Sequence, residues 1–431
     1  MSDSHDILIT DAYLYDRDGV YDIAIEDDRI TTIDDSVDGR GAVEINADGQ
    51  LVAPGFVDSH VHMDKAYSAA GDRFPKLNER GTNFSTAAEA GERHYTESSK
   101  ADLEENAVRL GREAVANGTL YMRTHVNVDA DIETKAIEAI LAAQDRLADV
   151  LELQVVPMAS DGILATEETP ELIREAIEMG GDAIGGADPA TRSNDPATAI
   201  ETWFEIAEEY NVEIDPHIQH PSTLGVQVLH AMADRTEAYG YHDRVTASHS
   251  YCLAEMQGLE FDVDTPGLVP AELKTFREGE LDTAIERFAE VGMKFVSCHP
   301  STRPGMPIHE FAEHDIPLGW GSDNIHDWII RHSRPDALQG ALANAFKLDY
   351  NQYSFATNPG IDLLWRMATD GGAEIMSIED RYGIEEGLSA DLVVFDEPSP
   401  QWAVIRQATR RYVIKDGTVV AENGSLTAET K

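Results

Sequence analysis

The middle of this chain alternates short apolar runs with longer amphipathic segments, and this alternation restricts the possible folds more than any other feature. The runs have the length of buried strands, while intervening segments such as 135–147 and 198–210 carry apolar residues at helical spacing. Eight strand–helix units in succession predict a (β/α)8 TIM-like barrel with insertions. An open doubly wound sheet is the alternative, but the sequence lacks the glycine-rich nucleotide fingerprint that such sheets usually carry. The eight predicted strands are 56–62, 120–126, 151–157, 183–187, 212–217, 245–249, 294–298 and 316–321.

Both ends of the chain have a different texture, in which apolar and polar residues alternate and Asp-Gly pairs mark turns. This pattern predicts that residues 1–55 and 380–431 together form a small β-sandwich domain, and that residues 56–379 form the barrel. An acidic stretch at 256–280 is predicted to be a long loop after the sixth barrel strand, where barrels often carry lids.

The charge balance is strongly acidic. Asp and Glu number 80 against 33 Lys and Arg, so the formal net charge is −47. Such a charge repels nucleic acid and anionic membranes, and it is typical of a solvated surface suited to high salt. No apolar run approaches the roughly 20 residues of a membrane span, and the first residues do not resemble a signal peptide. Cys252 and Cys298 are too few for a disulfide framework and are interpreted as barrel-packing residues in a reducing compartment. We therefore expect a soluble, cytoplasmic protein without nucleic-acid or membrane partners.

The stretch Pro-Gly-Phe-Val-Asp-Ser-His-Val-His-Met-Asp-Lys, residues 54–65, carries the strongest chemical signal. His60 and His62 lie two residues apart on a predicted strand, so both side chains point to the same face. On a barrel strand that face can be the interior, where two neutral imidazoles can hold one cation. A His-x-His pair alone is a weak signal, but this pair ends its strand, at the edge where a barrel keeps its active site.

Three further candidates, His217, His249 and Asp323, end or follow the fifth, sixth and eighth predicted strands. Each alone would more often be structural. Because the carboxyl ends of all barrel strands meet at one mouth, the three should converge with His60 and His62 and form a metal site. Imidazoles with one carboxylate suit a single divalent ion, zinc in the first place, with ferrous iron and manganese open.

Such an ion lowers the pKa of a bound water towards about 7, which makes hydroxide available at neutral pH. Asp323 can then take the proton of the water and pass it to a leaving amine, while His249 can bind the water or the developing alkoxide. Lys65 stands three residues after His62, where it could orient a ring oxygen or relay a proton. The alternative for Lys65 is an ordinary surface lysine.

Together these residues resemble the cytosine deaminase branch of the amidohydrolase superfamily, and within it the enzymes that degrade s-triazines. The resemblance runs nearly end to end and implies a barrel with a composite β-sandwich. It also implies His249 poised over the bound water, Lys65 in the site, and four metal ligands, which are His60, His62, His217 and Asp323. The matching motifs include His60-Val61-His62, Arg123-Thr124-His125-Val126, Asp188-Pro189-Ala190-Thr191-Arg192, Ser322-Asp323-Asn324-Ile325 and Ser399-Pro400-Gln401-Trp402-Ala403.

Departures from the family bear on the substrate. Cytosine deaminases carry a proton-shuttling glutamate three residues after the strand-five histidine, where this chain has His220. A substrate-binding glutamine expected after strand three is replaced by Ser160, and the aromatic residue after the strand-eight aspartate is Trp328, its register shifted by one. With Asn324, these are the predicted substrate-binding residues.

Three other residues at strand ends are interpreted as structural. His125 and Asp129 are expected to hydrogen-bond neighbouring loops, and Asp188 begins an Asp-Pro turn.

The sequence therefore predicts an enzyme that uses activated water to remove ammonia or an alkylamine from a nitrogen heterocycle, s-triazine or pyrimidine-like. A cytosine or isocytosine deaminase is the alternative. Ring opening of a cyclic amide is disfavoured, because the strand-four region 181–188 has no lysine for a two-metal site. A metal-binding relative without turnover is the hypothesis of another class. Since barrels of this family commonly assemble, a homo-oligomer is also open.

Overall fold

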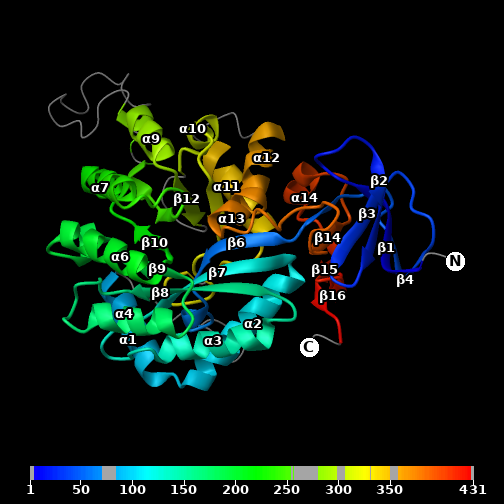
Figure 1. The fold of residues 1–431 in the computed structure, drawn as a ribbon. Helices are drawn as coiled ribbons and strands as arrows, with labels where there is room; N and C mark the ends of the chain where they lie inside the picture. Colours follow the sequence, from blue (N-terminus) through cyan, green and yellow to red (C-terminus); the bar gives the residue numbers. More distant parts are fainter. Residues whose placement is uncertain are drawn as a thin grey trace.

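Eight parallel strands, β6 to β13, form one sheet in the order of the chain (Figure 1). This computed structural model describes residues 4–69, 84–253, 256, 280–298, 306–330, 332–349 and 358–428, so the predicted loop at 256–280 lies outside the described residues except at its two ends. All eight predicted barrel strands are present, with ends within two residues of those expected. Their bounds are β6 Phe56–Val61, β7 Thr119–Asn127, β8 Glu152–Ala159, β9 Ala183–Gly186, β10 Glu213–Ile218, β11 Val245–His249, β12 Met293–Cys298 and β13 Leu318–Gly321.

The first and last strands of this sheet meet at their carboxyl ends. The backbone N–H of His62 donates to the carbonyl of Asp323 at 2.9 Å, and the N–H of Asp323 donates to the carbonyl of His60 at 2.8 Å. This pairing forms a parallel bridge between Val61 and Asp323. The predicted (β/α)8 barrel is therefore confirmed, and its seam passes through three of the predicted site residues.

Helices surround the barrel (Figure 1). In α3, Lys135–Leu147, buried residues such as Ile137, Ile140 and Leu147 recur at helical spacing, so one stripe packs on the sheet as the sequence predicts. The other helices are α1 Phe84–Glu97, α2 Lys100–Ala116, α4 Thr169–Glu178, α5 Pro189–Arg192, α6 Pro196–Tyr210, α7 Thr223–Tyr239, α9 Glu280–Glu290, α10 Ile308–Glu313, α11 Ala337–Asp349, α12 Asn358–Met367, α13 Asp370–Ile375, α14 Pro400–Arg406 and the 3-10 turn η1 Met63–Lys65.

The two ends of the chain lie side by side and form two smaller sheets, blue and red in Figure 1. One has the order β3-β2-β1-β4 and the other β17-β16-β15-β14-β5, so β5 from the N-terminal part pairs with β14 from the C-terminal part. Ile9 and Ile23 of the first sheet share one buried cluster with Leu392 and Ile414 of the second. This shared core confirms the predicted β-sandwich, while the exact domain boundaries at 55 and 380 stay a prediction. The strands are β1 Ser4–Tyr13, β2 Val20–Glu26, β3 Arg29–Asp34, β4 Arg40–Asn46, β5 Val52–Pro54, β14 Leu392–Phe395, β15 Arg410–Lys415, β16 Thr418–Glu422 and β17 Ser425–Leu426.

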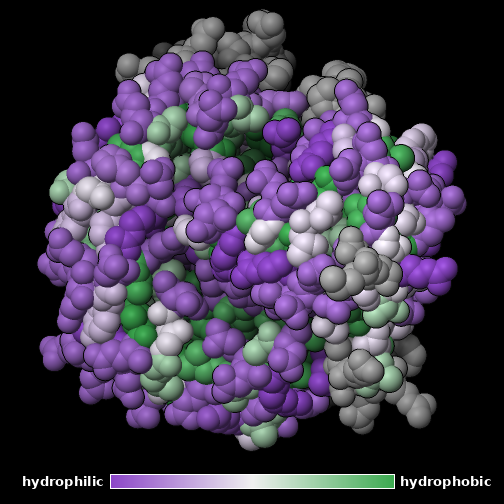
Figure 2. All heavy atoms as spheres, turned by 45° about the vertical axis from the view of Figure 1, so that its right-hand side comes forward, coloured by the Kyte–Doolittle hydropathy of each residue, from purple (hydrophilic) through white to green (hydrophobic). Residues whose placement is uncertain are grey.

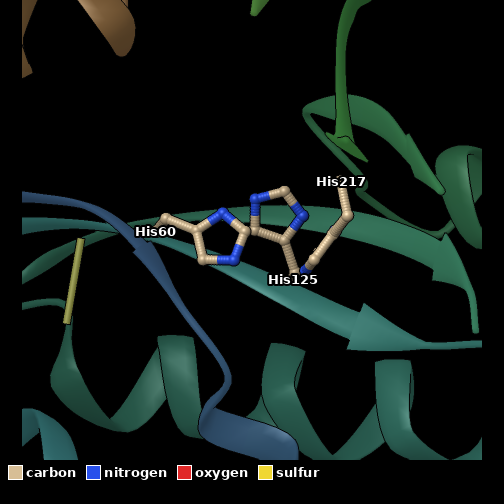
Figure 3. A group of neighbouring side chains, drawn as sticks. All are labelled: His60, His125 and His217. Carbon is tan, nitrogen blue, oxygen red and sulfur yellow. The ribbon is translucent and has the colours of Figure 1, made fainter. Parts of the chain in front are cut away.

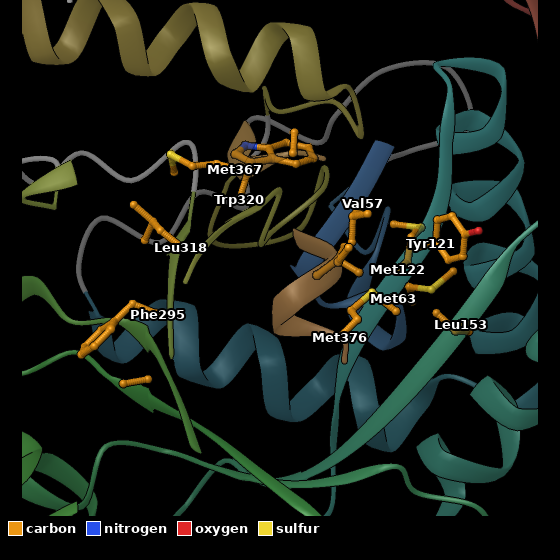
Figure 4. Close-up of a cluster of buried hydrophobic side chains, with 14 of the residues drawn as sticks. Val57, Met63, Tyr121, Met122, Leu153, Phe295, Leu318, Trp320, Met367 and Met376 are labelled. Atoms are coloured by element: carbon orange, nitrogen blue, oxygen red, sulfur yellow. The ribbon is translucent and has the colours of Figure 1, made fainter. Parts of the chain in front are cut away.

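Side chains of β6 alternate between the helix layer and the barrel interior. Val57 packs against α13, where a Cβ on Gly372 would come within 2.6 Å of it, and it belongs to the apolar cluster drawn in Figure 4. Because successive strand residues point to opposite faces, Asp58, His60 and His62 turn the other way, into the barrel. The fold thus places both histidines of the motif in the interior.

The face of the molecule in Figure 2 is covered mainly by hydrophilic residues, with smaller apolar areas between them. Among the described residues, no helix combines the length and the apolar character that crossing a membrane requires.

Candidate metal centre

Four predicted ligands lie at the carboxyl mouth of the barrel. They are His60 on β6, His62 directly after β6, His217 on β10 and Asp323 after β13. Nε2 of His62 lies 3.2 Å from Nε2 of His217 and 3.5 Å from Oδ1 of Asp323. Nε2 of His60 lies 3.9 Å from the same carboxylate oxygen. All four side chains are buried. Ligand atoms of His60, His62 and Asp323 therefore lie within 4.8 Å of one another, and His217 adjoins this group through its contact with His62.

These spacings fit a shared divalent cation. With Zn–N distances of about 2.0–2.1 Å, two ligand atoms at a tetrahedral angle lie about 3.3 Å apart. Within the described part of the chain, Nε2 of His60 and Nε2 of His249 are buried and have no hydrogen-bond partner. Buried polar atoms without partners are rare, and a cation with its water would satisfy them. The donor set therefore fits a metal of the kind the sequence suggests.

His125 joins this group, although the sequence suggested that its ring bonds neighbouring loops. Its ring lies 4.0 Å from that of His60 and 5.0 Å from that of His217, centre to centre, and Figure 3 shows the three together. Ligand nitrogens of these three rings lie within 4.8 Å of one another. His125 lies two residues after Arg123 on β7, so both side chains point to the same side of the strand, into the barrel. This alternation is the signal that could have placed His125 in the interior.

Burial keeps the histidines of the centre neutral. The pKa values of His60, His62 and His217 lie well below the ordinary value, first because burial disfavours the imidazolium form. Neighbouring imidazole rings lower the pKa of His60 and His217 further, and for His62 the charge of Lys65 comes before that of the rings. Burial likewise lowers the pKa of His249 to about 4. Neutral imidazoles keep a free lone pair, which metal binding requires.

His249 and Asp323 have left-handed backbones, with φ of 70° and 59°. Such values are uncommon for residues other than glycine and cluster at functional sites. Both residues stand where a barrel strand ends, so the turn redirects their side chains. His249 comes close to the metal centre in this way, with 5.0 Å between the centres of its ring and that of His217.

Two buried carboxylates, Asp58 and Asp215, lie next to the metal centre, and neither was assigned to it from the sequence. Asp58 accepts from the backbone N–H of Ser322 at 2.9 Å and from that of His60 at 3.3 Å, which ties β6 to β13. Burial raises the pKa of Asp58 to about 7. Asp215 of β10 accepts from Nη1 of Arg123 at 3.3 Å. Inward parity on a barrel strand would have found both carboxylates.

Lys65 lies at the mouth in η1 and is only 8% exposed, so it is not an ordinary surface lysine. Its Nζ stands 5.8 Å from the centre of the Trp328 ring. Trp328 in turn packs on His94 and Tyr95 of α1, with ring centres 5.3 and 5.9 Å away. The structure thus brings two predicted site residues together beside the metal centre.

The other predicted substrate residues also lie at strand ends. Ser160 follows β8, and its N–H donates to Oδ1 of Asn127 at 3.3 Å. Asn324 is 5% exposed, and its Oδ1 has no hydrogen-bond partner among the described residues. His220 follows β10, and its N–H donates to Oδ2 of Asp188 at 2.6 Å.

The structural interpretation of Asp188 and Asp129 agrees with their bonds. Asp188 caps α5 through the N–H of Ala190 at 2.7 Å. Oδ1 of Asp129 accepts from the N–H groups of Asp131 and Ile132, at 2.8 and 3.0 Å. Both carboxylates therefore shape loops at the mouth.

The described cavities include a cleft of about 600 Å³, but it lies away from this centre. Its walls come from the sandwich and from helices α12, α13 and α14, with Tyr15, Trp365 and Asp370 among them. None of the predicted site residues lines it. This cleft is therefore not the cavity in which the predicted residues would act.

Comparison with known proteins agrees with this geometry. Residues 87–421 match the amidohydrolase family. The chain therefore belongs to this family of hydrolases. It is 40% identical, over 99% of its own length and 100% of the relative, to N-isopropylammelide isopropyl amidohydrolase of Pseudomonas sp. strain ADP.

Solved structures give the same picture. N-isopropylammelide isopropylaminohydrolase from Burkholderia multivorans superposes with a TM-score of 0.84 at 28% identity, covering 98% of this chain and 99% of that one. A 5-methylcytosine deaminase from Klebsiella pneumoniae superposes with a TM-score of 0.80 at 22% identity, over 96% and 97% of the two chains, and at this identity it shows the fold alone. The expected family is confirmed, including its resemblance to the triazine enzyme.

Proposed function

We propose that this chain hydrolyses the bond between a heterocycle carbon and an exocyclic amine, and that its substrate is an s-triazine that carries an alkylamino group. The observation that carries the proposal is the 40% identity over the whole length to an enzyme named for N-isopropylammelide. The buried cluster of histidines and Asp323 supports it, because this chemistry needs activated water.

In this proposal His60, His62, His217 and Asp323 hold one divalent ion, with zinc as the first choice and Fe2+ or Mn2+ as alternatives. The ion would supply an acidified water at neutral pH. Zinc is the first choice because imidazole and carboxylate groups are its usual ligands in catalytic sites. His125 is an additional nitrogen donor that could complete the set.

The remaining roles belong to the protein's own groups. Asp323 accepts the proton of the attacking water at a carboxylate oxygen and returns it to the leaving nitrogen. His249, neutral at pH 7 because of its lowered pKa, accepts a hydrogen bond at Nε2 and so orients the water. Lys65 donates from Nζ to a ring oxygen, where it stabilises the charge that develops during attack.

His220 favours a triazine-like ring over cytosine. The backbone N–H of Ser222 donates to its Nδ1 at 3.3 Å, and the Ser222 hydroxyl lies 3.0 Å from the same nitrogen, so an accepting Nδ1 leaves the ring N–H at Nε2. His220 therefore presents an N–H donor where cytosine deaminases present a carboxylate. A substrate with a carbonyl oxygen or an unprotonated ring nitrogen would suit this donor. Ser160, Asn324 and Trp328 are proposed to line the rest of the ring.

The test is amine release by the zinc-loaded protein from N-isopropylammelide, ammelide, cytosine and isocytosine. We expect isopropylamine from N-isopropylammelide at a rate at least about tenfold above ammonia from the others. Faster ammonia release from cytosine would favour the deaminase alternative. One bound metal with no amine from any of the four would favour a metal-binding relative without turnover.

Asp323→Asn is the matched inactive variant for this assay. The amide keeps the shape of the carboxylate but cannot take the proton, so the rate should fall roughly 10²–10⁴-fold. Zinc content, measured by atomic absorption on the same samples, separates lost proton transfer from lost metal. A near-normal rate would remove Asp323 from the proton-transfer role.

We also propose a cytoplasmic enzyme that does not bind nucleic acid. Cys252 and Cys298 are free thiols, which suits a reducing compartment, and a net charge of −47 opposes contact with phosphates. Assembly into a homo-oligomer stays a prediction.

A further inference from the structure

A buried chain of three side chains runs from the metal centre into the barrel. Nδ1 of His60 lies 3.0 Å from the hydroxyl oxygen of Ser248 on β11. The Ser248 hydroxyl donates to Oδ1 of Asp215 on β10 at 2.8 Å. All three side chains are fully buried, with exposures of 0%. The far nitrogen of the same imidazole, Nε2, faces Asp323.

The chemistry of these groups fixes the direction of each hydrogen bond. An ionised carboxylate only accepts, so the single hydroxyl proton of Ser248 points to Asp215. The oxygen of Ser248 is then left to accept a proton from Nδ1 of His60. A neutral imidazole has one proton, so Nε2 carries the free lone pair.

We infer that Ser248 and Asp215 are positioning residues for the metal centre, which hold His60 in the Nδ1–H tautomer and thereby aim the lone pair of Nε2 at the ion. The inference rests on the metal site of the proposed function and adds two residues that act on it only through His60. His62 is oriented separately, since its Nδ1 donates to the carbonyl of His125 at 3.1 Å.

Arg123 holds Asp215 in place. Its Nη1 donates to the second carboxylate oxygen of Asp215, Oδ2, at 3.3 Å. The same guanidinium donates to Glu213 at 2.8 Å and to Gln154 at 2.9 Å, so side chains of β10 and β8 fix its position. Oδ1 of Asp215 thus faces Ser248, while Oδ2 faces Arg123 and lies 3.6 Å from Nε2 of His125.

Because of this arrangement, Asp215→Asn should reverse the direction of the hydrogen bonds from residue 215 through Ser248 to His60. Arg123 can only donate, so it attracts the amide oxygen to the Oδ2 position and turns the NH2 group towards Ser248. Ser248 then accepts from the amide and donates to Nδ1 of His60. The proton of His60 moves to Nε2, where it blocks the lone pair that faces the metal.

The experiment compares Ser248→Ala, Asp215→Asn and the control Ser59→Ala. Ser59 neighbours His60 and is equally buried, but its hydroxyl points away, towards Gly319 and α13. The first readout is the zinc dissociation constant, from competition with a chromogenic chelator. The second is the protonated nitrogen of His60 in the zinc-free protein, from long-range 1H–15N spectra assigned with His60→Gln.

We expect Ser248→Ala and Asp215→Asn to bind zinc roughly 10- to 100-fold more weakly, and Ser59→Ala to stay within about twofold of the parent. The His60 proton should sit on Nδ1 in the parent and on Nε2 in Asp215→Asn. Affinities equal to the control, or an unmoved proton in Asp215→Asn, would overturn the inference. If Asp215→Asn does not fold, Ser248→Ala still decides, because its His60 should lose the preference for Nδ1.

Failure of the proposed function would look different. A parent protein that binds no zinc would contradict the metal site, whereas the proton position of His60 in the zinc-free protein still tests Ser248 and Asp215.

Discussion

At the residue scale, the metal centre relies on histidines that burial keeps uncharged. Lys65 is likewise buried, and its position beside Trp328 places it at the mouth of the barrel and not on the outer surface. His60 and His62 were recognisable from their spacing, because parity on a strand depends on local geometry alone. His125, Ser248 and Asp215 were not assigned to the site, since each looks ordinary until neighbouring strands bring it to His60.

Replacement of Lys65 by alanine should lower kcat/KM for amine release at least about tenfold, because a charged donor to the ring oxygen is lost. The thermal unfolding midpoint should change little. The control is Lys100→Ala, whose half-exposed side chain bonds Glu138 at 3.0 Å on the surface. Unchanged kinetics of Lys65→Ala would return Lys65 to a structural role.

The lowered pKa of His249 predicts a pH dependence of stability in the metal-free protein. Its folded pKa of about 4 lies below the unfolded value of 6.5, so between these values the unfolded chain binds a proton that the folded ring does not. Stability should therefore fall as the pH drops from about 6.5 towards 4. Relative to His249→Gln, the parent should lose about 2 kcal/mol between pH 7 and 5, measured by urea unfolding. Parallel pH profiles would contradict the assigned burial.

At the element scale, the closure of β6 on β13 builds the site. The two strands approach so closely that β13 has glycine at both positions facing β6. A Cβ on Gly321 would lie 2.6 Å from Cβ and 2.8 Å from the carbonyl oxygen of His60. A Cβ on Gly319 would instead meet the hydroxyl of Ser59 at 2.6 Å and a side-chain carbon of Ile375 at 2.7 Å, and no atom of His60 is among its nearest contacts.

These contacts predict different results for two identical substitutions. Gly321→Ala and Gly319→Ala should each destabilise the fold by about 1–3 kcal/mol through overpacking. Only Gly321→Ala should also weaken zinc binding, because it displaces the backbone of His60. Urea unfolding and chelator competition measure the two effects. Equal zinc affinity in both variants would show that the seam does not control the ligand position.

At the scale of the whole molecule, the chain has 80 acidic residues against 33 basic ones. Figure 2 shows a face covered mainly by hydrophilic residues, and the solvated acidic surface stays a prediction. Repulsion among these charges favours the unfolded chain at low salt, and screening reduces it as the Debye length falls from about 10 Å at 0.1 M to about 3 Å at 1 M.

The thermal unfolding midpoint should therefore rise by several degrees or more between 0.1 and 2 M KCl. Calorimetry on the zinc-loaded protein measures this change, with constant free zinc so that metal binding does not shift with salt. Full stability in dilute buffer would argue against a salt-adapted surface.

The periodicity of the sequence determined the eight strands, the helical layer and the sandwich at the two ends, because burial on one or both faces follows directly from residue pattern. It also placed His60, His62, His217, His249 and Asp323 at strand ends, and parallel strands share one mouth. Only the tertiary structure decided that His125 turns its ring into the centre and that Ser248 and Asp215 stand behind His60. These contacts join residues from different strands, and the stagger between neighbouring strands, which no single strand encodes, sets which side chains meet.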